Sequence, residues 1–420
     1  MFKKLLTAAI GLSVIGTAQA APNLEEMWEL IQKQQAEIYQ LKTQLETTEK
    51  RVTETEVKTE ATFAAVEEVS VGPVAKLAEW ADKTTIGGYG EMHYNNLTSD
   101  NSSSSKEEFD LHRFVLFFGH QFTNDLRFFS ELEVEHNVAG EGKNGEVEIE
   151  QAYIEWDYAE NHRVKAGVFL TPVGILNETH EPETFYGVER NPVEKNIIPS
   201  TWWEGGAMFS GEIAEGFSYD AGVHSGLFIN PDPDPLKADD GKWKIRDGRQ
   251  KVSEAEGDDL AYTARIKYTG IPGLELATTF QHQTDIWQGE SFMGEDEADA
   301  NLVEMHAIYN KGPFGLRALY AHWDIDDVIE NVKAGADEQE GFYIEPSYRL
   351  NEKLGFFVRF SEWDNQAGES SADGEKQQYD IGFNYWLHEN VVLKADYRHD
   401  NNEGDSEEFS GFNLGVGWSF

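Results

Sequence analysis

The last nine residues of the chain read Phe412-Asn413-Leu414-Gly415-Val416-Gly417-Trp418-Ser419-Phe420. Alternate residues are large and apolar, and the terminal residue is aromatic. A period of two places these side chains on one face of an extended strand, because successive side chains in a strand point to opposite faces. The stretch therefore predicts a β-strand with one apolar face at the end of the chain.

The same period of two recurs from Thr85 onward. Leu132 and Val134, for example, alternate with Glu131, Glu133 and Glu135. Alternation of this kind indicates strands with one apolar and one polar face. We expect sixteen strands, at residues 85–95, 107–119, 125–136, 146–158, 162–170, 205–213, 217–226, 259–268, 273–285, 301–310, 313–324, 340–349, 354–364, 376–386, 391–400 and 410–420.

The connections between these strands alternate between short and long. The short ones have two to five residues and lie at 120–124, 159–161, 214–216, 269–272, 311–312, 350–353 and 387–390. Short turns on one rim, long loops on the other and an even strand number are typical of an outer-membrane barrel. A soluble β-sandwich or propeller would lack this asymmetry. The sequence therefore predicts an all-β fold, a transmembrane antiparallel β-barrel of about 16 strands at residues 85–420. The aromatic end of the last strand also resembles the closing strand of such barrels.

Composition excludes several other classes of protein. The 420 residues include 77 Asp and Glu against 34 Lys and Arg, a formal net charge of −43. Nucleic acid is therefore not an expected partner, because phosphate contacts need clustered Lys and Arg. The absence of Cys excludes disulfides, Cys-ligated metals and thiol nucleophiles. A mean hydropathy of −0.55 excludes a helical membrane bundle. We expect no cofactor and no resident metal.

The first twenty residues have the layout of a secretory signal peptide. Lys3 and Lys4 form a basic start, an apolar stretch runs from Leu5 to Ile15, and Ala18-Gln19-Ala20 is a cleavage site. The mature chain is therefore expected to begin at Ala21. An exported barrel predicts the outer membrane of a Gram-negative cell, with its lipid as a partner.

A seven-residue apolar repeat follows the signal peptide. One heptad position holds Leu24, Ile31, Ile38, Leu45 and Val52, and the other holds Met27, Gln34, Leu41 and Thr48. This repeat predicts a coiled coil, compatible with more than two helices. The polar Gln34 and Thr48 leave a lone amphipathic helix as the alternative. We expect residues 21–84 to form a periplasmic coiled coil with a connector at 69–83.

Charged residues are frequent at the inward positions of the predicted strands. Unpaired charges in an apolar core would cost several kcal/mol each, whereas a barrel of sixteen strands encloses a water-filled channel. The sequence therefore predicts a pore. Eleven inward positions are acidic, and ten bases are candidates for an anion track on one wall: Arg127, Arg163, Lys165, Arg265, Lys267, Arg317, Arg349, Arg359, Lys394 and Arg398.

The connection at residues 171–204 is the longest insert without strand character. Its apolar residues, such as Ile175, Leu176 and Phe185, would be out of place in a surface flap. We therefore expect this loop to fold into the barrel and narrow the bore; an outward lid or a latch to a second subunit are the alternatives. Its charged residues are candidates for the constriction: Glu181, Glu183, Glu189, Arg190, Glu194 and Lys195.

Three segments resemble the porin O and P family of phosphate-selective porins. They are Phe109 to Glu135, Gly167-Val168-Phe169-Leu170-Thr171-Pro172 with the loop after it, and Val358-Arg359-Phe360-Ser361-Glu362-Trp363. The resemblance covers most of the barrel. It implies a sixteen-stranded barrel, usually trimeric, with an inserted third loop and a phosphate selectivity that depends on lumenal arginines and a lysine cluster. The chain departs from the last feature, because Arg190 and Lys195 are the only Arg or Lys in its loop.

We therefore expect an outer-membrane porin that lets small hydrophilic solutes or inorganic ions diffuse passively and assembles as a homotrimer. Anions such as phosphate are candidate solutes. No enzymatic activity and no catalytic residue are expected.

Two other classes stay open as alternatives. A barrel hydrolase would need a Ser–His pair, for which the isolated candidates are His180, His224, His282, Ser210 and Ser225. A structural tether would act through the coiled coil. Glu91, His93 and His112 are a further candidate for a metal site, although alternate residues of a strand share a face by default.

Overall fold

The computed structural model describes residues 24–71, 73–100, 102–137, 145–229, 244–291, 297–326, 334–369, 374–402 and 407–420. The predicted signal peptide lies outside these residues. The chain divides into two compact units, Met1–Trp80 and Ala81–Phe420.

The described part of the first unit is helical. Helix α1 (Leu24–Val71) spans 48 residues, and α2 (Pro73–Asp82) follows it. Pro73 suits the first position of α2, where the missing N–H would have no helical partner. The segment expected to be a connector is therefore helical for most of its length. None of the described helices is long and apolar enough to cross a membrane.

The apolar heptad residues lie along one side of α1, and no other described segment covers them. Ile31, Ile38, Leu45 and Val52 are all exposed on the single helix. An exposed apolar seam of this kind is what a coiled coil buries between helices. The coiled coil stays a prediction.

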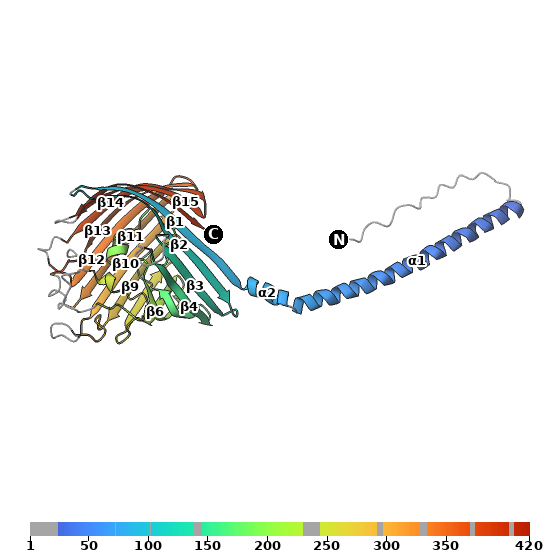
Figure 1. Cartoon of the computed structure of the whole chain (residues 1–420), viewed down its shortest axis with the longest axis horizontal. Helices are drawn as coiled ribbons and strands as arrows, with labels where there is room; N and C mark the ends of the chain where they lie inside the picture. Colours follow the sequence, from blue (N-terminus) through green and yellow to red (C-terminus); the bar gives the residue numbers. More distant parts are fainter. Residues whose placement is uncertain are drawn as a thin grey trace. The chain divides into compact units, whose positions relative to one another are not determined.

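The second unit contains sixteen strands (Figure 1). They are β1 (Thr84–Ser99), β2 (Ser105–Gln121), β3 (Leu126–Glu135), β4 (Val147–Ala159), β5 (His162–Leu170), β6 (Trp203–Ala214), β7 (Phe217–His224), β8 (Ala261–Tyr268), β9 (Leu274–Gln283), β10 (Ala300–Lys311), β11 (Phe314–Ile325), β12 (Glu338–Arg349), β13 (Leu354–Asp364), β14 (Lys376–His388), β15 (Val391–Asn402) and β16 (Phe409–Ser419). Each overlaps one of the predicted strands. The described residues of the long connections include two short helical segments, α3 (Val193–Asn196) and the 3₁₀ helix η3 (Ile245–Gly248).

The strands pair in sequence order and close into a barrel. Every neighbouring pair is antiparallel, and β1 closes the ring by pairing with β16. The closure is completed by two backbone hydrogen bonds between Gly88 and Phe420, at 2.9 and 3.0 Å. The predicted barrel and its strand number are confirmed. We call the rim with the short turns the turn rim and the opposite one the loop rim.

The two faces of the wall differ as the alternation predicted. On β14, the side chain of Ile381 points outward and is 58% exposed, whereas Asn384 points inward and is fully buried. Phe412 and Leu414 on β16 are likewise exposed outward. An apolar exterior around a polar interior is the pattern of a barrel that contacts lipid.

The lipid-facing assignment of Ile381 can be tested by charge. Because Ile381 lies in the middle of β14, I381R would place a guanidinium near the bilayer midplane, which costs about 2–4 kcal/mol. We expect I381R to lower the free energy of unfolding by that amount, measured by urea titration in lipid with tryptophan fluorescence. The control I381L keeps an apolar side chain and should change it by less than about 1.5 kcal/mol. An I381R protein as stable as the I381L control would contradict the assignment.

Candidate functional site

The connection between β5 and β6 lies inside the barrel. It hydrogen-bonds to inward side chains from strands that are distant in sequence. Thr279 of β9 donates to the carbonyl of Pro172 at 2.9 Å, and Asn384 of β14 donates to that of Phe185 at 2.9 Å. The N–H of Val188 donates to Asp396 of β15 at 2.7 Å. We call residues 171–202 the internal loop.

One side of the internal loop packs against an apolar part of the wall. Ile175, Leu176, Val193, Ile197 and Ile198 share a buried cluster with inward side chains of β10 to β13 and of nearby long loops. The wall residues of this cluster include Leu302, Leu319, Trp323, Tyr343 and Trp363. Trp323 also donates its indole N–H to the carbonyl of Ile197 at 3.0 Å. This side of the lumen is therefore a packed core.

Glu194, expected at the constriction, lies within the internal loop and is 1% exposed. Its Oε1 accepts hydrogen bonds from the N–H groups of Ile175 and Leu176, both at 2.6 Å. Its Oε2 accepts from Asn191 at 2.8 Å and from the Tyr343 hydroxyl at 3.0 Å. The carboxylate therefore holds two parts of the loop to each other and to β12.

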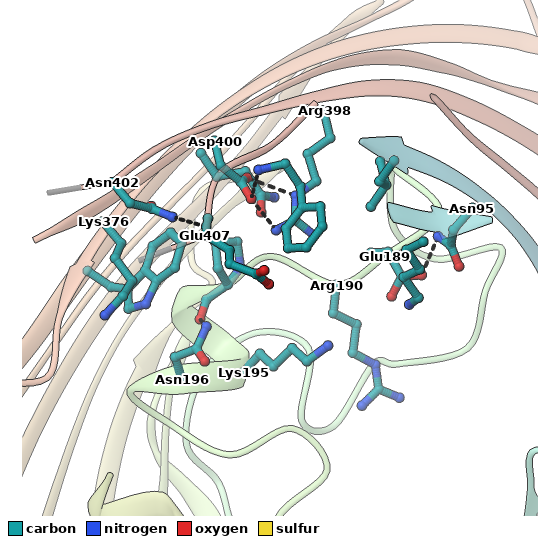
Figure 2. A pocket seen from close by; sticks show the side chains of 16 residues that line it. Asn95, Glu189, Arg190, Lys195, Asn196, Lys376, Arg398, Asp400, Asn402 and Glu407 are labelled. Carbon is teal, nitrogen blue, oxygen red and sulfur yellow. Dashed lines mark hydrogen bonds and ion pairs between the residues drawn. The ribbon is translucent and has the colours of Figure 1, made fainter. Parts of the chain in front are cut away.

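The other side of the internal loop borders two cavities. The first, which we call the Arg398 cavity, has a volume of about 350 Å³ and is drawn in Figure 2. The second, the Arg113 cavity, has a volume of about 230 Å³. Both are lined by Glu189, Arg190 and Lys195 of the loop. These three residues therefore border both cavities.

Bases outnumber acids among the described residues of both linings. The Arg398 cavity has Lys106, Arg190, Lys195, Lys376 and Arg398 against Glu189, Asp400 and Glu407. The Arg113 cavity has Arg113, Arg190, Lys195, Arg246, Arg249 and Lys251 against Glu91, Glu135, Glu148 and Glu189. In each of the two cavity linings, Lys and Arg residues outnumber Asp and Glu residues by two.

Glu189 is fixed to the wall by β1. One of its oxygens lies 3.2 Å from Nδ1 of His93 and accepts a hydrogen bond from Asn95 at 3.1 Å, as Figure 2 shows for Asn95. Burial raises the pKa of the Glu189 carboxyl, but the hydrogen bond and the charge of His93 outweigh burial and hold the pKa well below its ordinary value. The carboxylate is therefore ionised and turned toward the wall.

Arg190 and Lys195 are the cations of the loop that stay without a carboxylate partner in the described chain. Arg190 donates from Nη1 to the hydroxyl of Ser200 at 2.8 Å, while its Nε and Nη2 are buried and make no hydrogen bond with the described residues. Lys195 is exposed, and its side chain extends from α3 into the Arg398 cavity (Figure 2). Both can attract a passing anion.

The structure spreads the other predicted bases around the wall, most of them beside acids. Arg127 and Arg163 pair with Glu155 and Asp157 near the turn rim. Arg265 pairs with Glu178 and Asp220, Arg359 with Glu345 and Asp380, and Arg398 with Asp400. Arg317 donates to the carbonyl of Thr184, Lys165 lies over the rings of Tyr153 and Phe169, and Lys267 lies in β8. Of these wall bases, only Arg398 lines either cavity.

Several lining bases were missed in the sequence. Arg113 lies at an inward position of β2, but an extra residue, His112, interrupts the alternation between Asp110 and Arg113 and hid it. Arg246, Arg249 and Lys251 belong to the long β7–β8 connection, where no period exists. Glu181 and Glu183 lie in the internal loop and line neither cavity.

The residues considered for hydrolysis form no Ser–His pair. Ser225 donates to Glu204 at 2.5 Å and Ser210 donates to Asp220 at 2.6 Å. His224 contacts Thr263 at 2.8 Å and His282 contacts Asn301 at 2.8 Å. Each serine of interest is thus bonded to a carboxylate.

Comparison with known families decides the identity. A family model described as Gram-negative porin matches residues 61–405. The chain belongs to this family. Its barrel is an outer-membrane channel, as predicted.

Known proteins resemble this porin in sequence and in fold. A protein of Aquifex aeolicus (strain VF5), described as an "Uncharacterized protein", is 32% identical over 381 residues that span 83% of each chain. The anion-selective porin from Comamonas acidovorans has a TM-score of 0.57 at 14% identity, over 80% of this chain and 99% of that one. The channel DcaP of Acinetobacter baumannii has a TM-score of 0.55 at 14% identity, over 80% and 97%. OmpF of Salmonella typhi has a TM-score of 0.56 at 13% identity, over 80% and 97%. These structures share the fold.

The role of Glu194 in the porin can be tested directly. E194A removes the acceptor of four hydrogen bonds, and each buried donor left unsatisfied costs about 1–3 kcal/mol. We expect the internal loop to loosen, so that single-channel currents become larger and noisier and trypsin cuts faster at Arg190 or Lys195.

The matched control is E181Q, in the same loop. Thr184 hydrogen-bonds to the backbone carbonyl of Glu181, which E181Q retains. We expect E181Q to behave as the parent protein. Wild-type currents from E194A would show that this carboxylate does not hold the loop.

Proposed function

We propose that this porin lets small hydrophilic solutes diffuse passively across the outer membrane and that it favours inorganic anions over cations. The observation that carries the proposal is the excess of bases over acids in both cavities beside the internal loop. The name of the Comamonas porin, anion-selective, describes a protein of the same fold and adds support. The internal loop is the proposed constriction.

The strength of this preference depends on the distance between a passing ion and the cations of the loop. An ion that passes the internal loop comes close to Arg190 and Lys195, and a unit charge at 4 Å contributes about 1 kcal/mol even in water. The negative charge of Glu189, which His93 and Asn95 hold at the wall, is already included among the acids that the bases outnumber. A preference of about fivefold for each unopposed charge follows from this energy.

Phosphate is the most specific candidate solute. The resemblance to the porin O and P family implies phosphate selectivity through lumenal arginines and a lysine cluster. Here Arg190, Arg398 and Lys195 line one cavity together with Lys106 and Lys376. Arginine and lysine donors suit phosphate oxygens, so we propose phosphate among the permeating anions.

A channel without enzymatic activity is the function that the porin family and fold favour. The hydrolase alternative has no Ser–His pair at Ser210 or Ser225 to support it.

Anion preference can be measured as a reversal potential in planar bilayers under a KCl gradient. We expect wild-type protein to prefer chloride, and R190E/K195E to lower the chloride-to-potassium permeability ratio by at least about fivefold. Phosphate added to one side should block chloride current in the wild type more strongly than sulfate does, and the double variant should lose this block.

The control is K311E, which reverses an exposed charge next to a short turn at the turn rim. It should leave the reversal potential unchanged. A wild-type channel that prefers potassium would contradict the anion proposal, whereas a chloride preference without phosphate block would contradict only the phosphate part.

We also propose that the porin is a homotrimer, that residues 1–20 are a signal peptide, and that α1 forms a coiled coil in the periplasm. The exposed seam of Ile31, Ile38, Leu45 and Val52 supports helix association. A structural tether through this coiled coil would be an added role of the same segment.

The absence of Cys from the chain makes the seam testable by disulfide trapping. In a parallel coiled coil, seam residues of two helices approach within the range of about 4.4–6.8 Å between Cα atoms that a disulfide needs. We expect I38C to form covalent dimers under mild oxidation in native membranes. The control A36C lies on the opposite side of the repeat and should stay uncrosslinked. Equal crosslinking of both variants would contradict a specific seam.

A further inference from the structure

Three side chains that could bind a metal ion converge where the internal loop meets the wall. Nε2 of His180 lies 3.4 Å from Oε1 of Glu131 on β3 and 3.7 Å from Oε2 of Glu150 on β4. The three residues are 1–3% exposed. The ligand atoms thus come from three separate segments and meet at one buried point.

These three atoms have no hydrogen-bond partner in any part of the chain that the structure describes. Buried polar groups are normally hydrogen-bonded, and each exception needs an explanation. Glu133, on the same face of β3, adds another fully buried carboxylate, which pairs with Arg113 at 3.7 Å. Arg113 also pairs with Glu91 at 2.8 Å, and the ion pairs of Glu131 and Glu150 among the described residues are those with His180.

The remaining polar atom of each candidate ligand is held by a protein group. Nδ1 of His180 lies 3.0 Å from the carbonyl oxygen of Asn177, which can only accept, so Nδ1 carries a proton. Gln151 donates to Oε2 of Glu131 at 2.6 Å, and Thr201 donates to Oε1 of Glu150 at 2.5 Å. Outer partners of this kind orient metal ligands in proteins. They leave Nε2 and the two free oxygens turned toward one another.

A bulge in β4 places Glu150 in this cluster. Glu131 is paired with Gln151 and Leu132 with Ile149, so Glu150 is the extra residue between them. Gln151 faces the lumen, so in a regular strand its neighbour Glu150 would face lipid. Bulges are known to redirect side chains at functional sites, and here the bulge brings a carboxylate to His180.

We propose that His180, Glu131 and Glu150 bind one divalent metal ion of the zinc class and so fasten the internal loop to β3 and β4. Zinc lies about 2.0–2.2 Å from nitrogen and oxygen ligands in tetrahedral geometry. Neighbouring ligand atoms are then roughly 3.3–3.6 Å apart, close to the two distances from Nε2. One nitrogen and two carboxylate oxygens are a donor set that zinc accepts, with its remaining position open to water.

A second cluster provides a matched control. Asp110, His112 and His136 also bring potential ligand atoms together. There Nδ1 of each histidine is already 2.9–3.1 Å from Asp110, so hydrogen bonds within the cluster satisfy the atoms. All three residues are partly exposed. This cluster therefore lacks the unpartnered buried atoms that mark the His180 site.

The test uses full-length protein refolded in detergent, free of lipopolysaccharide, because lipid A phosphates bind divalent ions. Protein stripped with EDTA is dialysed against Zn²⁺, then against metal-free buffer, and its zinc is counted by mass spectrometry. We expect H112N to retain about one ion per chain and H180N and E150Q to lose it. Q151A removes an outer partner only and should weaken zinc binding by about 10–100-fold. Folding of each variant is checked on gels: a variant was folded if its heated sample migrates more slowly than its unheated sample.

Cobalt provides a readout that needs no variant. Co²⁺ bound by the wild type at this site should give visible absorption bands that Zn²⁺ displaces. Equal zinc retention by H180N and wild type, or loss of the ion in H112N alone, would overturn the proposal. So would stripped wild-type protein that neither retains zinc nor develops the cobalt bands.

Discussion

The structure depends on one constraint: no backbone N–H or C=O group may stay unpaired against lipid. Because hydrocarbon offers no hydrogen-bond partner, an open sheet edge is costly, and only a closed ring of strands removes it. The pairing of β1 with β16 and the hydrogen bonds between Gly88 and Phe420 satisfy this condition. Closure also divides every strand into a face toward lipid and a face toward the lumen, which is why the sequence alternates with a period of two.

A ring of sixteen strands encloses more space than side chains of the wall can fill. The internal loop solves this by bringing an apolar face of its own, which packs on inward residues such as Leu302, Leu319 and Trp323. The filled side of the lumen is thereby separated from a polar side, where Asn95, Arg113 and Arg398 line the cavities. Glu194 makes this arrangement possible, because it satisfies backbone donors that the folded loop would otherwise bury without partners.

Alternation made the strands predictable, whereas the path of a loop left no periodic signal. All sixteen strands could be found because lipid imposes the same pattern on each. The ten wall bases were predicted from inward positions, and of these only Arg398 lines either of the two cavities, since the path of the internal loop determines which part of the wall stays open. Composition could not separate Glu194, a structural carboxylate, from Glu189, which borders both cavities. The inward position of Glu150 was not predicted for a different reason: Glu150 is the extra residue of a bulge, and a bulge reverses the face that alternation assigns.

The net charge of −43 and a cation-rich passage are compatible, because they act over different distances. At physiological ionic strength the Debye length is about 8 Å, so exposed acids farther than this from an ion inside the barrel are largely screened from it. An ion beside the internal loop experiences chiefly the charges within a few ångströms, where Arg190 and Lys195 are present and Glu189 is bound to the wall. Lower salt would extend the reach of the outer acids and reduce the rate at which anions arrive, while leaving the local excess at the loop unchanged. The selectivity of such a channel therefore follows from the placement of a few charged side chains and not from the sign of the net charge of the whole protein.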